Sequence, residues 1–331
     1  MKARIADLAF MMGFFTPLAI IGRGRGSILM LHEVHADERL ARFDGCTASQ
    51  LEFTLATLRR WDIDLISMDE LLPRLRSDNL RQFVVITLDD GYRDNLVTAL
   101  PIFERYRAPA LINVPTLAPT RELYCWWLGL RELVMTRDSV EFPPFGRRLD
   151  LGTLEAKRRS YRQMQSWMAG DFSRAEDLRT WFEAHGISFP ALCDRFFMSE
   201  DELKACAAHP LVTIGGHSTT HRPLASLPEA EMRAELSDNR IYLENLLQTS
   251  VDHMAYPYGG KAQCGRREAT AARDAGFRTA VAVRHGKLTE SNLDSPHMLP
   301  REDIGYQGMS ERRLYGVVNG LYGIRAGLVG A

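Results

Sequence analysis

Short apolar runs, separated by segments of helical spacing, constrain the fold of this chain more than any other feature. The clearest run covers residues 83–88, is rich in β-branched side chains and shows no polar alternation. Such a strand is buried on both faces, which is typical of a parallel sheet covered by helices. Similar runs occupy residues 27–32, 110–114 and 212–216. The alternation of strands and helices therefore predicts an α/β fold.

One long interruption divides this pattern. Between about residues 119 and 207 the sequence is charged and helix-prone, with no convincing strand run. We interpret it as a helical insertion in a domain of residues 27–308, because strands resume at about residue 212. Residues 1–26 are predicted to form a lead-in helix and residues 309–331 a helical tail. The length of 331 residues suits one α/β barrel.

Charge and cysteine content exclude several classes of protein. Lys and Arg number 41 and Asp and Glu 42, and this balance argues against a nucleic-acid binder. Five cysteines, an odd number without a CxxC pair, do not form a disulfide framework and suit a reducing compartment. The apolar stretch 8–22 is too short to span a bilayer and lacks a cleavage site. We therefore expect a cytoplasmic protein, with membrane contact not favoured and no stable protein partner indicated.

Polar residues follow three of the apolar runs, at the point where each run ends. Asp89 and Asp90 follow the run 83–88, and His217 and His221 follow the run 212–216. A Pro-Tyr-Gly turn at 257–259 follows a third run, at 253–256. In parallel α/β sheets the carboxyl ends of the strands meet at one edge, where functional sites collect. Each motif alone has an ordinary reading as a turn or a surface pair. Their joint occurrence favours a site.

These residue types point to a metal. Two carboxylates side by side repel each other in a dry cleft unless a cation lies nearby. His217 and His221, four residues apart, share one face of a helical turn, and imidazole suits zinc. Two histidines and one carboxylate leave an open coordination position, as in catalytic zinc sites. The metal would lower the pKa of bound water, and the second aspartate would then act as base.

At this point the motifs resemble a known family, the polysaccharide deacetylases of carbohydrate esterase family 4 with their NodB-homology domain. The first family motif, T-F-D-D-G, corresponds to Thr87-Leu88-Asp89-Asp90-Gly91. The second, H-S/T-x-x-H, corresponds to His217-Ser218-Thr219-Thr220-His221, and the third, in its A-Y-P-Y-G form, to Ala255-Tyr256-Pro257-Tyr258-Gly259. The run Ile28-Leu29-Met30-Leu31-His32 and the pair Trp126-Trp127 are also similar to segments of family members. The resemblance spans about residues 28–305.

The resemblance implies a distorted (β/α)7 barrel of the NodB type and a metal-dependent deacetylase. It implies Asp89 as catalytic base and Asp90, His217 and His221 as ligands of one divalent ion. Zinc is the expected ion, with cobalt and nickel as alternatives. Substrate or oxyanion contacts are expected from six further residues, among which the backbone N–H of Tyr258 would help to hold the oxyanion: Tyr92, Trp126, Trp127, Pro257, Tyr258 and Gly259.

The sequence departs from the family pattern in two places, at the arginine that orients the base and at the histidine that acts as acid. Many members carry an arginine in the third motif, where this chain has Ala255. Arg301, after a short apolar strand, is the candidate that would orient Asp89. The family's histidine acid has only loose counterparts, and we expect it to be His297. His32 also follows a strand, but a core or supporting role is expected for it.

The expected function is removal of the N-acetyl group from N-acetylglucosamine-type residues of a poly- or oligosaccharide, as in a chitooligosaccharide deacetylase. This would be a hydrolase acting on non-peptide carbon–nitrogen bonds, with an N-acetylated carbohydrate as its partner. An O-deacetylase, or a deacetylase of a lipid- or nucleotide-linked sugar, stays open with the same site. An inactive carbohydrate-binding barrel is less favoured, because loss of activity would most simply remove a ligand. An interaction protein that uses Trp126 and Trp127 is the remaining alternative.

Overall fold

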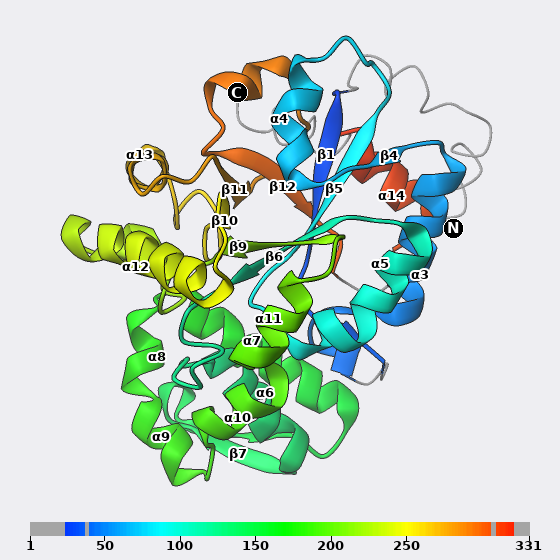
Figure 1. Ribbon diagram of the computed structural model, residues 1–331. Coiled ribbons are helices and arrows are strands. Elements are labelled where there is room, and N and C mark those ends of the chain that lie inside the picture. Colours follow the sequence, from blue (N-terminus) through cyan, green and yellow to red (C-terminus); the bar gives the residue numbers. More distant parts are fainter. Residues whose placement is uncertain (1–23, 37–39, 306–308, 321–331) are drawn as a thin grey trace, which may run out of the picture.

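Seven parallel strands close into a barrel in the part of the chain that the computed structural model describes, residues 24–36, 40–305 and 309–320 (Figure 1). The ring is closed because β1 pairs with both β12 and β5. This confirms the predicted (β/α)7 barrel. In order around the ring the strands are β1 (Gly26–Leu31), β12 (Leu299–Asp303), β11 (Thr279–Val283), β10 (His253–Ala255), β9 (Val212–Gly216), β6 (Ala110–Val114) and β5 (Phe83–Leu88).

The barrel is distorted beside β5. The last three residues of β5 pair with β6, whereas its first two pair with the short strand β4 (Asp64–Leu65). Strand β4 therefore lies outside the ring and covers the half of β5 that β6 leaves free. Each of the six side chains of β5 is buried, as the continuous apolar run predicts.

Helices surround this barrel, and their starts follow local capping chemistry. Ser67 and Glu70 form the capping box that opens α4, and Thr47 caps α3. The long helix α12 begins after Pro228, and Ser226 lies in a separate 3-10 turn before it. The barrel helices are α3 (Ala48–Arg60), α4 (Met68–Arg76), α5 (Leu100–Tyr106), α12 (Glu229–Leu247) and α13 (Arg266–Asp274).

The segment between β6 and β9 packs as a lobe on one end of the barrel, below it in Figure 1. It has its own apolar core, in which Phe142, Tyr161 and Phe182 are buried. It is mostly helical, but it also holds a hairpin that the sequence did not indicate, because both strands have only four residues. Its elements are α6 (Trp126–Thr136), β7 (Ser139–Phe142), β8 (Arg147–Asp150), α7 (Leu154–Ala169), α8 (Ser173–Asp177), α9 (Arg179–Ala184), α10 (Phe189–Phe196) and α11 (Glu200–Ala207).

The two ends of the chain are described only in part. Residues 1–23, and with them the predicted lead-in helix, lie outside the described residues, and Gly26 already belongs to β1. Helix α14 (Glu311–Val318) begins the predicted helical tail, and the carbonyl of Val318 accepts hydrogen bonds from Ser27 and Gln82. Among the helices of the described ranges, none is long and apolar enough to cross a bilayer. The cytoplasmic location stays a prediction.

Candidate active site

The carboxyl end of β5 delivers Asp89 and Asp90 into a turn with unusual backbone geometry. Asp90 has φ of 73° and Gly91 has φ of 69°, both in the left-handed region. A Cβ at Gly91 would also lie 3.1 Å from the Val114 side chain. A non-glycine residue in this region costs free energy and persists where its surroundings enforce it, commonly at functional sites. The turn points the two adjacent carboxylates in different directions.

The loop after β9 brings two buried imidazoles to the same edge. Its residues Ser218 and His221 also have positive φ, 60° and 59°. Two side chains of α12 hold this loop: Asn239 accepts from the backbone N–H of His217, and Glu235 accepts from those of Thr219 and Thr220. Glu235 and Asn239 are 4% and 0% exposed. The sequence analysis missed both, although they are polar residues on the buried face of an amphipathic helix.

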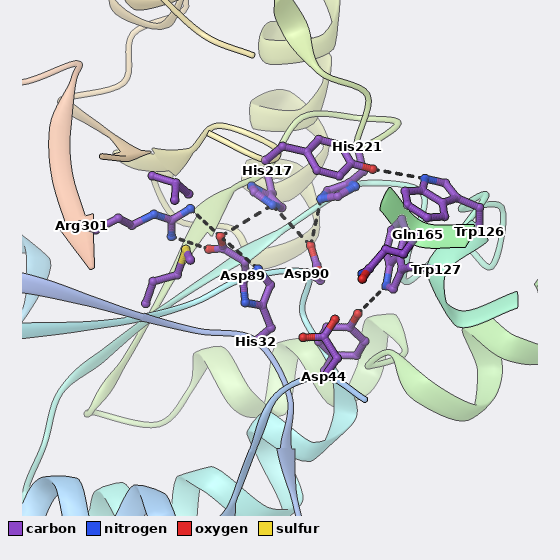
Figure 2. A pocket seen from close by; sticks show the side chains of 14 residues that line it. His32, Asp44, Asp89, Asp90, Trp126, Trp127, Gln165, His217, His221 and Arg301 are labelled. Carbon is purple, nitrogen blue, oxygen red and sulfur yellow. Dashed lines mark hydrogen bonds and ion pairs between the residues drawn. The ribbon is translucent and has the colours of Figure 1, made fainter. Parts of the chain in front are cut away.

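Asp90, His217 and His221 form a cluster with the geometry of a metal site (Figure 2). Asp90 Oδ1 lies 3.4 Å from His217 Nε2 and 3.1 Å from His221 Nε2. Tetrahedral ligands about 2.1 Å from a zinc ion are about 3.4 Å apart, so these spacings fit. Asp90 Oδ1 is buried without a hydrogen-bond partner. His217 Nδ1–H donates to the Ala255 carbonyl at 2.8 Å, which leaves the Nε2 lone pair free to bind a metal.

A second cluster of side chains that could bind a metal already has a cationic partner. Glu33, His35 and Asp94 lie close together near the same end of the barrel. Both carboxylate oxygens of Glu33, however, accept from the buried guanidinium of Arg131. Asp90, His217 and His221 are therefore the better candidate ligands for a metal ion.

Asp89 is fixed by Arg301, as the sequence predicts. Arg301 Nη1 donates to Oδ1 at 2.8 Å and Nη2 to Oδ2 at 2.5 Å, and Arg301 is 1% exposed. Asn113 Nδ2 on β6 donates to Asp89 Oδ1 at 2.9 Å. The sequence analysis missed Asn113, whose signal is a lone amide near the end of an apolar strand. A bidentate guanidinium fixes the plane of a carboxylate, so Asp89 is held in one orientation.

Burial raises the pKa of the Asp89 carboxyl, but Arg301 and His217 more than offset this effect and bring it to about 2. Burial likewise raises the pKa of Asp90, and the two histidines bring it well below its usual range. Both carboxylates are therefore ionised at neutral pH.

The third motif forms a tight turn after β10. Tyr258 and Gly259 have φ of 61° and 59°, and the Gly259 carbonyl accepts from the Val283 N–H on β11 at 2.9 Å. A Cβ at Gly259 would lie 2.7 Å from the nitrogen of Val283, so glycine is required here. The turn, opened by Pro257, directs the Tyr258 side chain toward the metal ligands, with its ring 4.9 Å from that of His221.

The three remaining predicted residues form an aromatic shell around His221. The ring of Trp127 lies 4.9 Å from the ring of His221, and its Nε1 donates to the Tyr92 hydroxyl at 2.7 Å. Trp126 Nε1 donates to the Tyr258 hydroxyl at 3.3 Å. The two tryptophans are only 5% and 8% exposed, so most of their surface packs against protein. They line the cavity but present only a small part of their surface to it.

His297 is not part of the site, so its prediction as catalytic acid is wrong. It precedes β12 and therefore lies at the amino end of that strand, whereas Arg301 lies toward the carboxyl end. Its Nε2 contacts the carbonyl of Phe277, and its own carbonyl accepts from Tyr256. His32 lies at the site instead. Its Nε2 is 4.0 Å from Asp89 Oδ2, and its side chain is 35% exposed.

A cavity of about 230 Å³ joins these groups, and Figure 2 shows its lining side chains. Asp89, Asp90, His217, His221 and Arg301 line one part of it. Two polar lining residues come from outside the motifs and were missed: Asp44, two residues before the short strand β3 (Cys46–Thr47), and Gln165, on α7 of the insertion. The insertion thus contributes directly to the cavity.

Comparisons with known proteins agree with this arrangement. Residues 174–280 match the family model of the polysaccharide deacetylases. This segment contains the second and third motifs. A search of curated proteins found no match.

Several solved structures share the fold at low sequence identity. The Streptococcus pyogenes deacetylase PplD, in complex with acetate, has a TM-score of 0.57 and 18% identity over 88% of this chain and 96% of that chain. IcaB from Ammonifex degensii has a TM-score of 0.57 and 16% identity, covering 89% of this chain and 96% of its own. A de-N-acetylase from Aggregatibacter actinomycetemcomitans has a TM-score of 0.55 and 13% identity, covering 87% and 97%. These structures share the fold of this chain, and the family match over residues 174–280 confirms the resemblance of that segment to the polysaccharide deacetylases.

Proposed function

We propose that this chain, whose residues 174–280 match the polysaccharide deacetylase family, is a metal-dependent hydrolase of N-acetyl groups on glucosamine-type residues of a glycan. The family match supports deacetylase activity. The observation that carries the proposal is the pairing of two adjacent aspartates with different partners. Asp90 faces two imidazoles, and Asp89 is held by Arg301 beside them. Metal-assisted hydrolysis needs these two roles, a carboxylate that binds the ion and a second carboxylate that acts as base.

Asp90, His217 and His221 would hold one divalent ion, for which zinc best suits the donor set. When bound, the ion supplies Lewis-acid polarisation of the acyl oxygen and activation of water. Asp89 accepts the proton of the attacking water, because its carboxylate is ionised and held in place beside the proposed metal ligands. Its Oδ2 lies 3.9 Å from Nε2 of His217. The Tyr258 backbone N–H, carried over from the motif, would donate to the oxyanion of the tetrahedral intermediate.

His32 is the proposed general acid. Burial lowers the pKa of its imidazole, but Asp90 and Asp89 outweigh this effect and raise it above the usual value. Part of its side chain faces the cavity, where it can reach a leaving amine. Protonation of that nitrogen lets the carbon–nitrogen bond break, with acetate and a free amine as products.

A panel of N-acetylated and O-acetylated glycans tests this function. Acetate release would be followed with purified protein, with the Asp89→Asn variant as a matched control. We expect acetate together with an equal amount of new amine from an N-acetylated glycan, and turnover about 10²–10⁴-fold lower in the variant. Acetate without amine would identify an O-deacetylase. No release from any glycan, even with added zinc, would count against deacetylation altogether.

A further inference from the structure

Two buried cysteines of the insertion meet where two of its helices are in contact. Cys125 lies directly before the first residue of α6, and Cys193 lies on α10, both in the lobe below the barrel (Figure 1). Their sulfur atoms are 4.0 Å apart, and the two residues are 0% and 1% exposed. Both belong to the core of the insertion, whereas the other three cysteines belong to the core of the barrel: Cys46, Cys206 and Cys264.

The contact between the helices is close because α6 has a glycine where it meets α10. Gly129 lies four residues after Cys125, and Phe189 lies four residues before Cys193, so each pair shares one face of its helix. A Cβ at Gly129 would lie 3.0 Å from the ring of Phe189. The glycine thus lets α10 approach α6, and this approach brings the two sulfur atoms into contact.

The two thiols differ in how readily they ionise. Cys193 donates to the Leu123 carbonyl at 3.4 Å, which leaves Cys125 as the donor toward Cys193. This hydrogen bond lowers the pKa of the Cys193 thiol below its ordinary value, whereas burial raises the pKa of Cys125 well above it. The thiolate is the form of cysteine that reacts with oxidants, so Cys193 reacts first.

The neighbours of Cys125 connect the pair to the cavities of the protein. Tyr124 and Trp126 line a groove of about 920 Å³ that adjoins the catalytic cavity and shares Trp126 with it. Cys125 therefore lies directly behind the wall of this groove. A small oxidant that enters the groove reaches the sulfur atoms through a local opening of the wall.

We propose that Cys125 and Cys193 form a reversible disulfide, with a peroxide as the oxidant. The sulfur atoms, now 4.0 Å apart, must approach to about 2.0 Å, and rotation about the two Cα–Cβ bonds swings them toward each other. One reversible pair is compatible with a sequence that has no disulfide framework. The inference does not depend on the substrate of the catalytic cavity.

The reaction has two steps. The Cys193 thiolate attacks one oxygen of hydrogen peroxide, the O–O bond breaks, and Cys193 becomes a sulfenic acid; the hydroxide that leaves takes up the proton lost by the thiol and forms water. Cys125 then loses its proton and attacks the sulfenic sulfur, the S–O bond breaks, and a second water leaves. The two thiols together lose two electrons, which the peroxide gains.

The disulfide would join α6 to α10 across 68 positions of the sequence. Such a cross-link restricts the unfolded chain, so the oxidised protein should be more stable. It would also fix the start of α6, where Trp126 and Trp127 line the catalytic cavity. The proposed metal ligands include no thiol, so the same reaction cannot occur at the metal site.

Peptide mapping of the folded wild-type protein tests the pair. Protein freed of dithiothreitol would be treated with hydrogen peroxide, alkylated in denaturant and digested with trypsin. Cleavage after Arg and Lys places Cys125 in peptide 122–131 and Cys193 in peptide 180–195. We expect mass spectrometry to find these two peptides linked and the other three cysteines alkylated. Renewed treatment with dithiothreitol before alkylation should remove the link.

The melting temperature gives a second readout. Oxidation should raise it by at least about 5 °C in the wild type. Cys125→Ala and Cys193→Ala should each abolish this rise, because either variant leaves a single thiol. Cys206→Ala is the matched control, because Cys206 is equally buried but belongs to the barrel core, and it should retain the rise.

Three outcomes would overturn the inference. The first is that the folded protein yields no linked peptide at any peroxide concentration that leaves it folded. The second is oxidation of Cys193 to sulfinic acid while Cys125 is recovered alkylated. The third is a rise in melting temperature that persists in both Cys125→Ala and Cys193→Ala.

Discussion

Arg301 binds both carboxylate oxygens of Asp89, at 2.8 and 2.5 Å, although the two residues are 212 positions apart in the sequence. Arg301 lies on β12 and Asp89 follows β5; β1 lies between these strands and pairs with both. The third motif carries Ala255, so the guanidinium comes from another strand of the barrel. The orientation of the proposed base is therefore a property of the closed barrel.

The first prediction concerns this pair. Arg301→Lys keeps the positive charge but loses the two parallel hydrogen bonds, so Asp89 is no longer fixed in one plane. We expect turnover to fall at least tenfold, about 1.4 kcal/mol of activation free energy. Metal content and the melting temperature should change little. Arg284→Lys, on the neighbouring segment and outside the cavity lining, is the control. Near-normal turnover of Arg301→Lys would show that the two guanidinium hydrogen bonds do not position Asp89.

The two adjacent aspartates should respond differently to the same change. Asp89→Asn should keep the metal and lose about 10²–10⁴ in turnover, because an amide cannot accept the proton of water. Asp90→Asn should lose metal affinity as well, because it removes the carboxylate ligand between His217 and His221. Metal content and acetate release would be measured on both variants. Metal loss in Asp89→Asn with retention in Asp90→Asn would reverse the assignment.

The identity of the general acid is tested by two histidines. His32→Gln should lower turnover about 10²–10⁴-fold, because His32 faces the cavity beside Asp89. His297→Gln should leave turnover nearly unchanged, because its ring contacts Phe277 away from the cavity. Steady-state kinetics on one glycan compare the two. The reverse pattern would restore His297 as the acid and contradict the placement of the site.

Asp94 gives a prediction about pH and stability. Burial and the neighbouring Glu33 raise the pKa of Asp94 to about 8 from an ordinary value of 3.8. Between these values the folded protein binds more protons than the unfolded chain, so the free energy of unfolding falls as pH rises through this window. Asp94→Asn cannot acquire the buried negative charge that the wild type gains as pH rises. Its free energy of unfolding should therefore exceed that of the wild type by about 2 kcal/mol at pH 8 and equal it at pH 4.

Thermal unfolding of both proteins across this pH range measures the difference. Asp78→Asn is the control, because Asp78 is exposed. A difference between Asp94→Asn and wild type that does not grow with pH would show that Asp94 is ionised in the folded protein.

The proposed base and metal ligands lie just beyond the ends of two apolar strands, since Asp89 and Asp90 follow β5, and His217 and His221 lie in the loop after β9. This placement revealed Asp89, Asp90, His217 and His221 together with the parallel barrel, because the ends of parallel strands converge. Arg301 followed from the same rule. His297 failed it, because it precedes β12 and a strand of five residues is about 16 Å long. The motif match that indicated His297 is loose, and the polarity of β12 places that residue at the opposite end of the strand from the site.

Other parts of the site carried weaker signals. Asn113 contacts Asp89 from the neighbouring strand β6, and Glu235 on α12 holds the loop after β9; no spacing along the chain indicates these partners. Gln165 enters the cavity only because the insertion folds back over the barrel. The hairpin of β7 and β8 was hidden because four-residue strands show too little alternation to be separated from helix. Tertiary packing, which the sequence does not display locally, decided each case.

Asp90, His217 and His221 are proposed to hold one catalytic divalent ion. Elemental analysis of protein purified without chelator, beside the His217→Ala variant, tests this site most directly. His217 is a suitable target because its Nε2 points at Asp90 while its Nδ1 contacts the Ala255 carbonyl. We expect about one ion per chain in the wild type and nearly none in the variant, with both proteins folded. An unchanged metal content in folded His217→Ala would show that these three residues do not hold the ion.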